Sequence, residues 1–241
     1  MIMKKTVLIK NCAPRFHATR SNSKLGKMLA ISYVPGADFR FLKNGTLVSD
    51  CKGTCGCVDC KHCERACYAC RSYDQYPAVT LNRVENTMQL REDIQQHFSD
   101  IGDYIEKHHV AIVRYTESGE IESYEQFYAL YWLAKCTPDT RFYLYTKNYD
   151  VLRRFFRYHV LPDNLVVLVS IWGDLGREEW NEFKKYSNVK CFAVHAEDLM
   201  PAIMCPAYKL VNGKVVRTGK TCAECKLCFD SKAKMIGCYE H

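Results

Sequence analysis

The chain has 241 residues, of which 48% are hydrophobic and 25% are charged, and its formal net charge is +7. These proportions exclude a disordered, collagen-like or extremely charged protein, and the length is ample for a sizeable hydrophobic core. The unusual feature is the fifteen cysteines, because a chain of this size does not need disulfides to hold it together.

The compartment in which the protein resides determines whether its cysteines form disulfides or stay reduced. Its longest apolar runs, such as residues 165–169, fall well short of the roughly 18 to 20 residues of a membrane span, and no segment resembles a signal peptide. We therefore expect a cytoplasmic protein with no membrane partner. Cytoplasmic thiols stay reduced, so clustered cysteines indicate metal ligands or redox groups. Thiolates bound to metal would offset the positive charge, so the charge gives only weak support for a nucleic-acid partner.

The first elements expected along the chain are a hairpin and a helical region. Asn44 and Gly45 lie between two apolar stretches, residues 39–42 and 46–48, which is a strong hairpin signal. Residues 82–108 are polar with regularly spaced apolar positions, a pattern that predicts one or two amphipathic helices covering a sheet.

The middle of the chain alternates between strand and helix patterns. Strands are expected at residues 110–115, 141–145, 165–172 and 189–194, and helices at residues 124–135, 151–159 and 178–185. This alternation predicts right-handed crossovers and a parallel sheet. Four such strands form a partial barrel or an open sheet, and we expect the partial barrel: a single α/β domain over residues 1–241 whose core, residues 110–197, is a partial parallel β/α barrel.

The first cysteine-rich segment, residues 51–70, is expected to bind metal. It has seven cysteines, Cys51, Cys55, Cys57, Cys60, Cys63, Cys67 and Cys70. Such short spacings let several thiolates converge on one centre, as in iron–sulfur and zinc sites. Zinc sites usually consist of two separated Cys-x2-Cys pairs, whereas this run is continuous and irregular, so we favour an iron–sulfur cluster.

The second segment, residues 205–238, has a more specific spacing. Cys222, Cys225 and Cys228 follow one another at two-residue gaps, and the more distant Cys205 precedes a proline. This resembles the ligation of a [4Fe-4S] cluster in bacterial ferredoxins. Asn212 and Gly213, between residues 208–211 and 214–216, predict a second hairpin that would bring Cys205 towards Cys222.

Two ligand sets are open for the first cluster. Cys63, Cys67 and Cys70 have the Cys-x3-Cys-x2-Cys spacing of radical SAM enzymes, in which three thiolates leave one iron open to chelate S-adenosylmethionine. The alternative combines Cys60, Cys63 and Cys67 with an upstream thiolate, Cys55 or Cys57, and closes all four corners. We favour the closed set, because free upstream thiolates would tend to bind an open iron.

Several short motifs are distributed along the chain. They are Asn22-Ser23-Lys24-Leu25-Gly26-Lys27, Gly53-Thr54-Cys55, Cys63 with Cys67-Tyr68-Ala69, the stretch 113–121 with its Ser118-Gly119-Glu120 turn, Phe142-Tyr143-Leu144-Tyr145-Thr146-Lys147, and the Cys222-x2-Cys225-x2-Cys228 ending. Together these motifs resemble the phage gene product 88 family. The resemblance implies a fold related to that of radical SAM enzymes and an iron–sulfur cofactor. It implies no particular reaction.

Polar residues that follow the expected strands are the candidates for a ligand pocket, because ligands of parallel α/β sheets bind at the carboxyl ends of the strands. We select Arg114, Glu117, Ser118, Lys147 and His195 as cofactor-binding candidates. The metal-ligand candidates are Cys55, Cys57, Cys60, Cys63, Cys67, Cys70, Cys205, Cys222, Cys225 and Cys228.

The function expected from these features is that of an iron–sulfur protein with two [4Fe-4S] clusters. It would be a radical-SAM-like redox or radical enzyme of phage or prophage origin, with S-adenosylmethionine as a candidate cofactor and an unidentified substrate or electron-transfer partner. The alternative is a phage-encoded protein that binds nucleic acid or a host protein and uses its clusters, or zinc, as structural elements.

Overall fold

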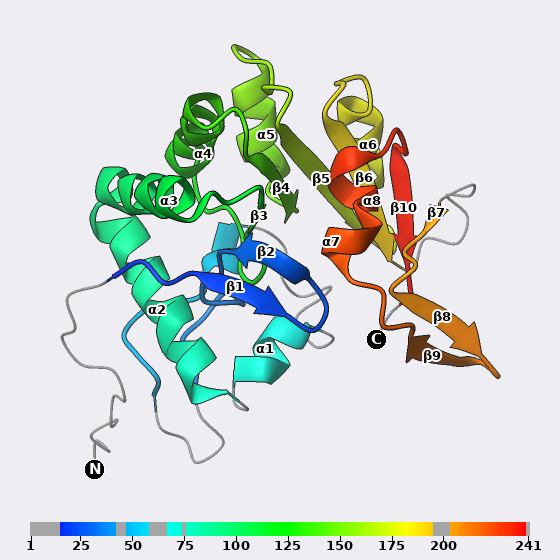
Figure 1. Cartoon of the computed structure of the whole chain (residues 1–241), viewed down its shortest axis with the longest axis horizontal. Coiled ribbons are helices and arrows are strands. Elements are labelled where there is room, and N and C mark those ends of the chain that lie inside the picture. The colour runs from blue at the N-terminus through cyan, green and yellow to red at the C-terminus, as the bar shows by residue number, and fades with distance from the viewer. Residues whose placement is uncertain (1–14, 42–46, 58–66, 74–75, 195–202, 240–241) are drawn as a thin grey trace.

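A computed structural model describes residues 15–41, 47–57, 67–73, 76–194 and 203–239 (Figure 1). Its strands are β1 (Thr19–Asn22), β2 (Gly26–Ala30), β3 (Ile112–Tyr115), β4 (Arg141–Thr146), β5 (Leu165–Trp172), β6 (Val189–Val194), β7 (Ile203–Met204), β8 (Tyr208–Val211), β9 (Lys214–Arg217) and β10 (Met235–Cys238). Its helices are η1 (Thr54–Cys57), α1 (Tyr68–Tyr73), α2 (Pro77–Glu92), α3 (Ile94–His108), α4 (Tyr124–Cys136), α5 (Tyr149–Phe156), α6 (Arg177–Phe183), α7 (Cys222–Cys225) and α8 (Leu227–Asp230).

Eight of the described strands form one sheet in the order β1-β2-β3-β4-β5-β6-β10-β7. The β1 and β2 strands pair antiparallel, and the pairs from β2 to β7 are all parallel. The fold is therefore mixed α/β with a mostly parallel sheet, as predicted. The sheet is open, because β1 and β7 are its two edges and do not pair with each other.

The four helices α3 to α6 pack on one face of this sheet (Figure 1). From β3 to β6 the strands follow one another in space as they do in sequence, so successive right-handed crossovers place their helices on the same side. Alternate side chains of β4, such as Phe142 and Leu144, contribute to this helical core. The main hydrophobic core of the protein thus lies between the sheet and these helices.

The opposite face of the sheet is covered by the C-terminal cysteine-rich segment. Tyr143 of β4 points to this side, and Phe229 of α8 stacks on it with ring centroids 4.8 Å apart. The backbone N–H of Cys222 donates to the carbonyl of Lys24 (3.0 Å) in the turn between β1 and β2. The turn between β1 and β2 and the C-terminal cysteine-rich segment therefore meet over this face of the sheet, which we call the inner face.

Gly26 makes this close approach possible. Its φ is +76°, and a Cβ atom at this position would lie 2.8 Å from the Thr221 hydroxyl oxygen. Only glycine combines this backbone conformation with so short a distance at no steric cost.

The predicted elements agree closely with the described ones. The expected strands at 165–172 and 189–194 coincide with β5 and β6, and the region 82–108 forms α2 and α3. The second hairpin is confirmed as β8 and β9, with positive φ at Asn212 (50°) and Gly213 (73°). The first hairpin has its turn outside the described residues, although Phe41 and Leu47 beside it form an antiparallel bridge. Among the described residues, no helix has the length and apolar character needed to cross a membrane.

Candidate functional site

A cavity of about 220 Å³ lies at the carboxyl ends of five neighbouring strands, β3, β4, β5, β6 and β10. Its wall contains residues 116–120 after β3, Thr146 and Lys147 at the end of β4, and Ser170 and Trp172 of β5. Phe192 and Val194 of β6 complete this part of the wall. The cavity thus occupies the position where ligands of parallel α/β sheets usually bind.

The predicted cofactor-binding residues meet at this cavity. Arg114, Glu117, Ser118 and Lys147 all line it, whereas His195 lies outside the described residues. A role in ligand binding stays a prediction for each of them. The structure adds Lys24, which lies in the turn between β1 and β2. Lys24 does not follow a parallel strand, so the search for polar residues at strand ends did not select it.

Both cysteine-rich segments contribute to the same cavity. Cys55 and Cys67 come from the first segment, and four thiols come from the second, namely Cys205, Cys222, Cys228 and Cys238. Cys225 lines a small neighbouring cavity together with Cys205, Cys222 and Cys228. The Cys57 side chain, Cys60 and Cys63 lie outside the described part of the chain.

Cys238 is the thiol that the predicted ligand set lacked. It ends β10, which lies between β6 and the edge strand β7 of the sheet. Its strand pattern is too short to recognise in the sequence, and the ferredoxin-like spacing is already complete without it. The place of Cys238 on the cavity wall follows from tertiary pairing alone.

Backbone docking fixes the position of the first segment. The N–H of Thr54 donates to the carbonyl of Val34 (2.8 Å), and the N–H of Cys55 donates to that of Gly36 (2.8 Å). The Thr54 hydroxyl also donates to Val34 (3.0 Å) and accepts from the N–H of Glu120 (2.8 Å). Through this side chain, the turn after β3 and the first cysteine segment are held together.

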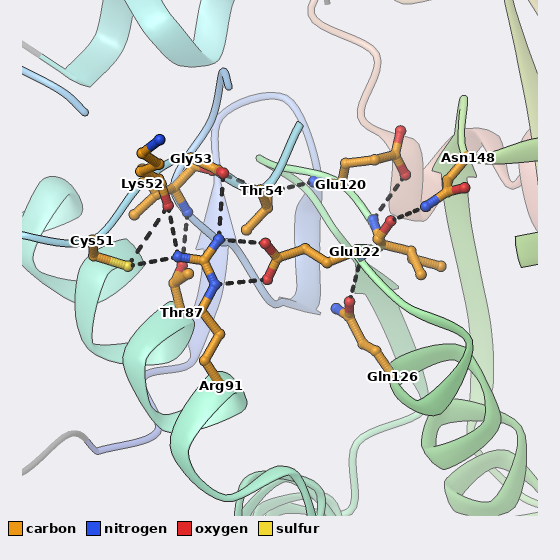
Figure 2. Close-up of polar contacts among 12 residues, drawn as sticks. Cys51, Lys52, Gly53, Thr54, Thr87, Arg91, Glu120, Glu122, Gln126 and Asn148 are labelled. Atoms are coloured by element: carbon orange, nitrogen blue, oxygen red, sulfur yellow. Dashed lines mark hydrogen bonds and ion pairs between the residues drawn. The ribbon is translucent and has the colours of Figure 1, made fainter. Parts of the chain in front are cut away.

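Arg91 of α2 binds the beginning of the same segment, as Figure 2 shows. Its guanidinium donates to the carbonyls of Lys52 (2.9 Å) and Gly53 (3.3 Å) and to the Cys51 thiol (3.2 Å), and it forms an ion pair with Glu122. Cys51 is buried in this contact, and its burial raises the pKa of the thiol. Cys51 does not line the cavity and is a structural member of the segment.

Hydrogen bonds between thiols shift their acidity at the cavity. The Cys70 thiol lowers the pKa of Cys67 to about 6, mainly by donating a hydrogen bond to it. The Cys238 thiol does the same for Cys205, whose pKa also falls to about 6. Burial raises the pKa of Cys228 to about 12, and the positive charges of Lys24 and Arg114 oppose the effect of burial on the pKa of Cys222. Each segment therefore contains one thiol that ionises readily.

The two acidic residues of the cavity are engaged by the protein itself. Glu117 accepts from Ser32 (2.9 Å) and Tyr68 (3.3 Å) and faces Arg83 at 3.9 Å. Glu120 accepts from the backbone N–H groups of Ile121 and Lys147, both at 2.8 Å, and its burial raises the pKa of its carboxyl group. In the described part of the chain, no group of three or more His, Cys, Asp and Glu side chains is arranged to hold a metal ion.

The fold and the site define a class of protein: an open-sheet α/β protein with a cavity at the carboxyl ends of its strands, here called the strand-end cavity, that is lined by cysteines from both cysteine-rich segments. The family model described as gene product 88 matches residues 17–231. The chain therefore belongs to the gene product 88 family. No curated protein and no solved structure matches it.

Proposed function

We propose that this chain is an iron–sulfur protein of radical-SAM-like descent that binds two [4Fe-4S] clusters and acts as a redox or radical enzyme. The observation that carries the proposal is the convergence of the two cysteine-rich segments. They are separated by more than a hundred residues of sequence, yet both present thiols to one cavity. That cavity lies where a parallel α/β sheet binds its ligands.

The chemistry of the donors supports a cluster. Thiolates are the usual ligands of iron–sulfur clusters, and the spacing of Cys222, Cys225 and Cys228 is ferredoxin-like. A cluster of four irons and four sulfides spreads its ligands over a larger body than a single ion does. The lack of a preformed single-ion site among the described residues is therefore compatible with it.

The residues around the thiols would favour the bound cluster. Lys24 and Arg114 place positive charge near Cys205 and Cys222, which stabilises thiolates. The aromatic side chains of Tyr145 and Phe192 line the same cavity and add apolar surface to its wall. When bound, a cluster supplies one-electron chemistry that no side chain of the protein can provide.

The ligand set of the first cluster determines whether it can act on a substrate. Cys67, near the end of the first segment, lines the cavity and accepts a hydrogen bond from Cys70. Cys55, nearer the beginning of that segment, also lines the cavity. We favour the closed set that includes Cys60, so Cys70→Ala should keep the cluster and Cys60→Ala should lose it or expose one iron. The opposite result, with an EPR change on adding S-adenosylmethionine, would establish the open iron of a radical enzyme.

Metal analysis of anaerobically purified protein tests the proposal as a whole. Two intact clusters require about eight irons and eight acid-labile sulfides per chain. Cys222→Ser should remove about half of both, whereas Cys136→Ser should remove neither, because Cys136 is exposed at the end of α4. Stoichiometric zinc without labile sulfide would refute the proposal and favour a binding protein with structural zinc.

A further inference from the structure

The Arg114 side chain is directed to the inner face of the sheet. It belongs to β3, in which Val113 and Tyr115 point to the helical core on the other face. Its neighbour across the strands is Tyr143, which also faces inward. Arg114 lines the strand-end cavity and is only 9% exposed.

This guanidinium makes no hydrogen bond within the described residues. Its Nε atom is buried without a partner, and the contact that the side chain makes is with an aromatic ring, at 4.8 Å from the centroid of Tyr145. Guanidinium groups that are buried in proteins are normally paired, because the charge and its five N–H donors are costly to remove from water. The arrangement leaves a buried N–H donor of Arg114 available to a molecule that enters the cavity.

The nearby carboxylates are not oriented to serve as that partner. Glu117 is bound by Ser32, Tyr68 and Arg83, and Glu120 by two backbone N–H groups. Neither of these two carboxylates therefore accepts a hydrogen bond from the Arg114 guanidinium. Lys147, on the same wall, adds positive charge to the cavity.

We propose that the cavity binds a small organic carboxylate, with the Arg114 guanidinium as the group that recognises its carboxylate. The planar fork of arginine matches a carboxylate by two parallel hydrogen bonds. Tyr145, Trp172 and Phe192 offer aromatic surface to the apolar body of such a molecule. A cavity of about 220 Å³ is small for a drug-sized ligand and suits a compact molecule.

Two other occupants are less consistent with these surroundings. Phosphate sites in α/β proteins are usually formed by backbone N–H groups at a glycine-rich turn before a helix, and the N–H groups of Glu120 and Lys147 at this edge are already bonded within the protein. A cluster bound to Cys222 would carry negative charge that offsets part of the positive charge of Arg114. That role requires no aromatic wall and no bidentate partner, so the two possibilities differ in what they bind.

Titration with matched probes tests the inference. Anaerobically purified protein is titrated with benzoate, phenyl phosphate and benzamide, and binding is followed by calorimetry and ligand-observed NMR. We expect benzoate to bind, and benzamide, which has the same shape without the charge, to bind about 10- to 100-fold more weakly. Arg114→Met and Arg114→Lys should both weaken benzoate binding by at least that factor, since lysine keeps the charge and loses the fork.

The controls separate a binding role from a structural one. Arg141→Met changes another arginine of the same sheet, which lies near Asp230 and does not line the cavity, and it should leave benzoate binding unchanged. If Arg114→Met does not fold, Arg114→Lys, with an unfolding midpoint like that of the wild type, decides the question.

Preference for phenyl phosphate, binding that both Arg114 variants retain, or no benzoate binding by the wild type would each overturn the inference. Loss of iron from Arg114→Met without benzoate binding by the wild type would also overturn it and make Arg114 a countercharge of the cluster. The inference does not depend on the clusters. A protein that contains no iron but binds benzoate through Arg114 would refute the proposed function and leave this inference standing.

Discussion

Replacing Thr54 by valine removes the hydroxyl that joins the first cysteine segment to the turn after β3. Thr54 is fully buried, donates to the carbonyl of Val34 (3.0 Å) and accepts from the N–H of Glu120 (2.8 Å). Valine has nearly the same shape but cannot form either bond. The substitution therefore tests how firmly this one side chain positions Cys55.

The expected cost can be worked out from the two bonds. The carbonyl of Val34 keeps the bond from the Thr54 backbone N–H (2.8 Å), so losing the hydroxyl there costs little. The N–H of Glu120 loses the acceptor at 2.8 Å, and a buried donor left unpaired costs about 1 to 3 kcal/mol. We therefore expect Thr54→Val to lower the free energy of unfolding by about 1 to 3 kcal/mol in total.

Urea unfolding measures this cost, and limited proteolysis locates it. Residues 51–57 should become accessible to protease well below the midpoint of global unfolding. Thr140→Val is the matched control, because it removes one buried hydroxyl bond, to the carbonyl of Val110 (2.7 Å), before β4 at the opposite end of the strand from the cavity. A stability of Thr54→Val within about 0.5 kcal/mol of the wild type, or equal protease resistance of the segment in both variants, would refute the reasoning.

Two further predictions concern the docking of the chain ends and the pH dependence of stability. Gly26→Ala should release the C-terminal cysteine segment, because its Cβ would lie 2.8 Å from the Thr221 hydroxyl oxygen, and hydrogen exchange in α7 should become faster. Gly213→Ala is the control: its φ of +73° is similar, but nothing lies within 4 Å of the added Cβ, so exchange in α7 should stay as in the wild type. Equal exchange in the two variants would count against the docking. Burial lowers the pKa of His97 to about 4 in the fold from an unfolded value near 6.5, so the neutral ring contributes stability that is complete above pH 6.5 and is lost as the pH falls towards 4, about 3 kcal/mol in all. In urea unfolding, His97→Gln should show a shallower decline over this range, and an unchanged slope would contradict the assignment.

Local sequence patterns predicted the central fold well because they reflect local physics. The segments 165–172 and 189–194 match β5 and β6 because short, largely apolar segments rich in β-branched residues are typical of strands buried on both faces of a parallel sheet. The turn at Asn212 and Gly213 formed as expected, since these two residues accept the positive φ that the hairpin requires.

Tertiary contacts determined what the sequence patterns could not. Lys24 reaches the cavity because the turn before β2 docks on α7, and Cys238 does so because β10 pairs with β6. Neither pairing leaves a local signal in the sequence. Arg114 was a candidate through its place in a strand, but the absence of a hydrogen-bond partner within the described residues emerged only from its surroundings.

The magnetic interaction between the two clusters tests the central claim most directly. Cysteines from both segments line one cavity, so clusters bound to them would lie close together. EPR of the reduced, anaerobically purified protein should show spectra that are broadened or split by spin coupling, and Cys222→Ser should leave the simple spectrum of a single cluster. Two uncoupled spectra that add without interaction, or no cluster signal at all, would contradict the account.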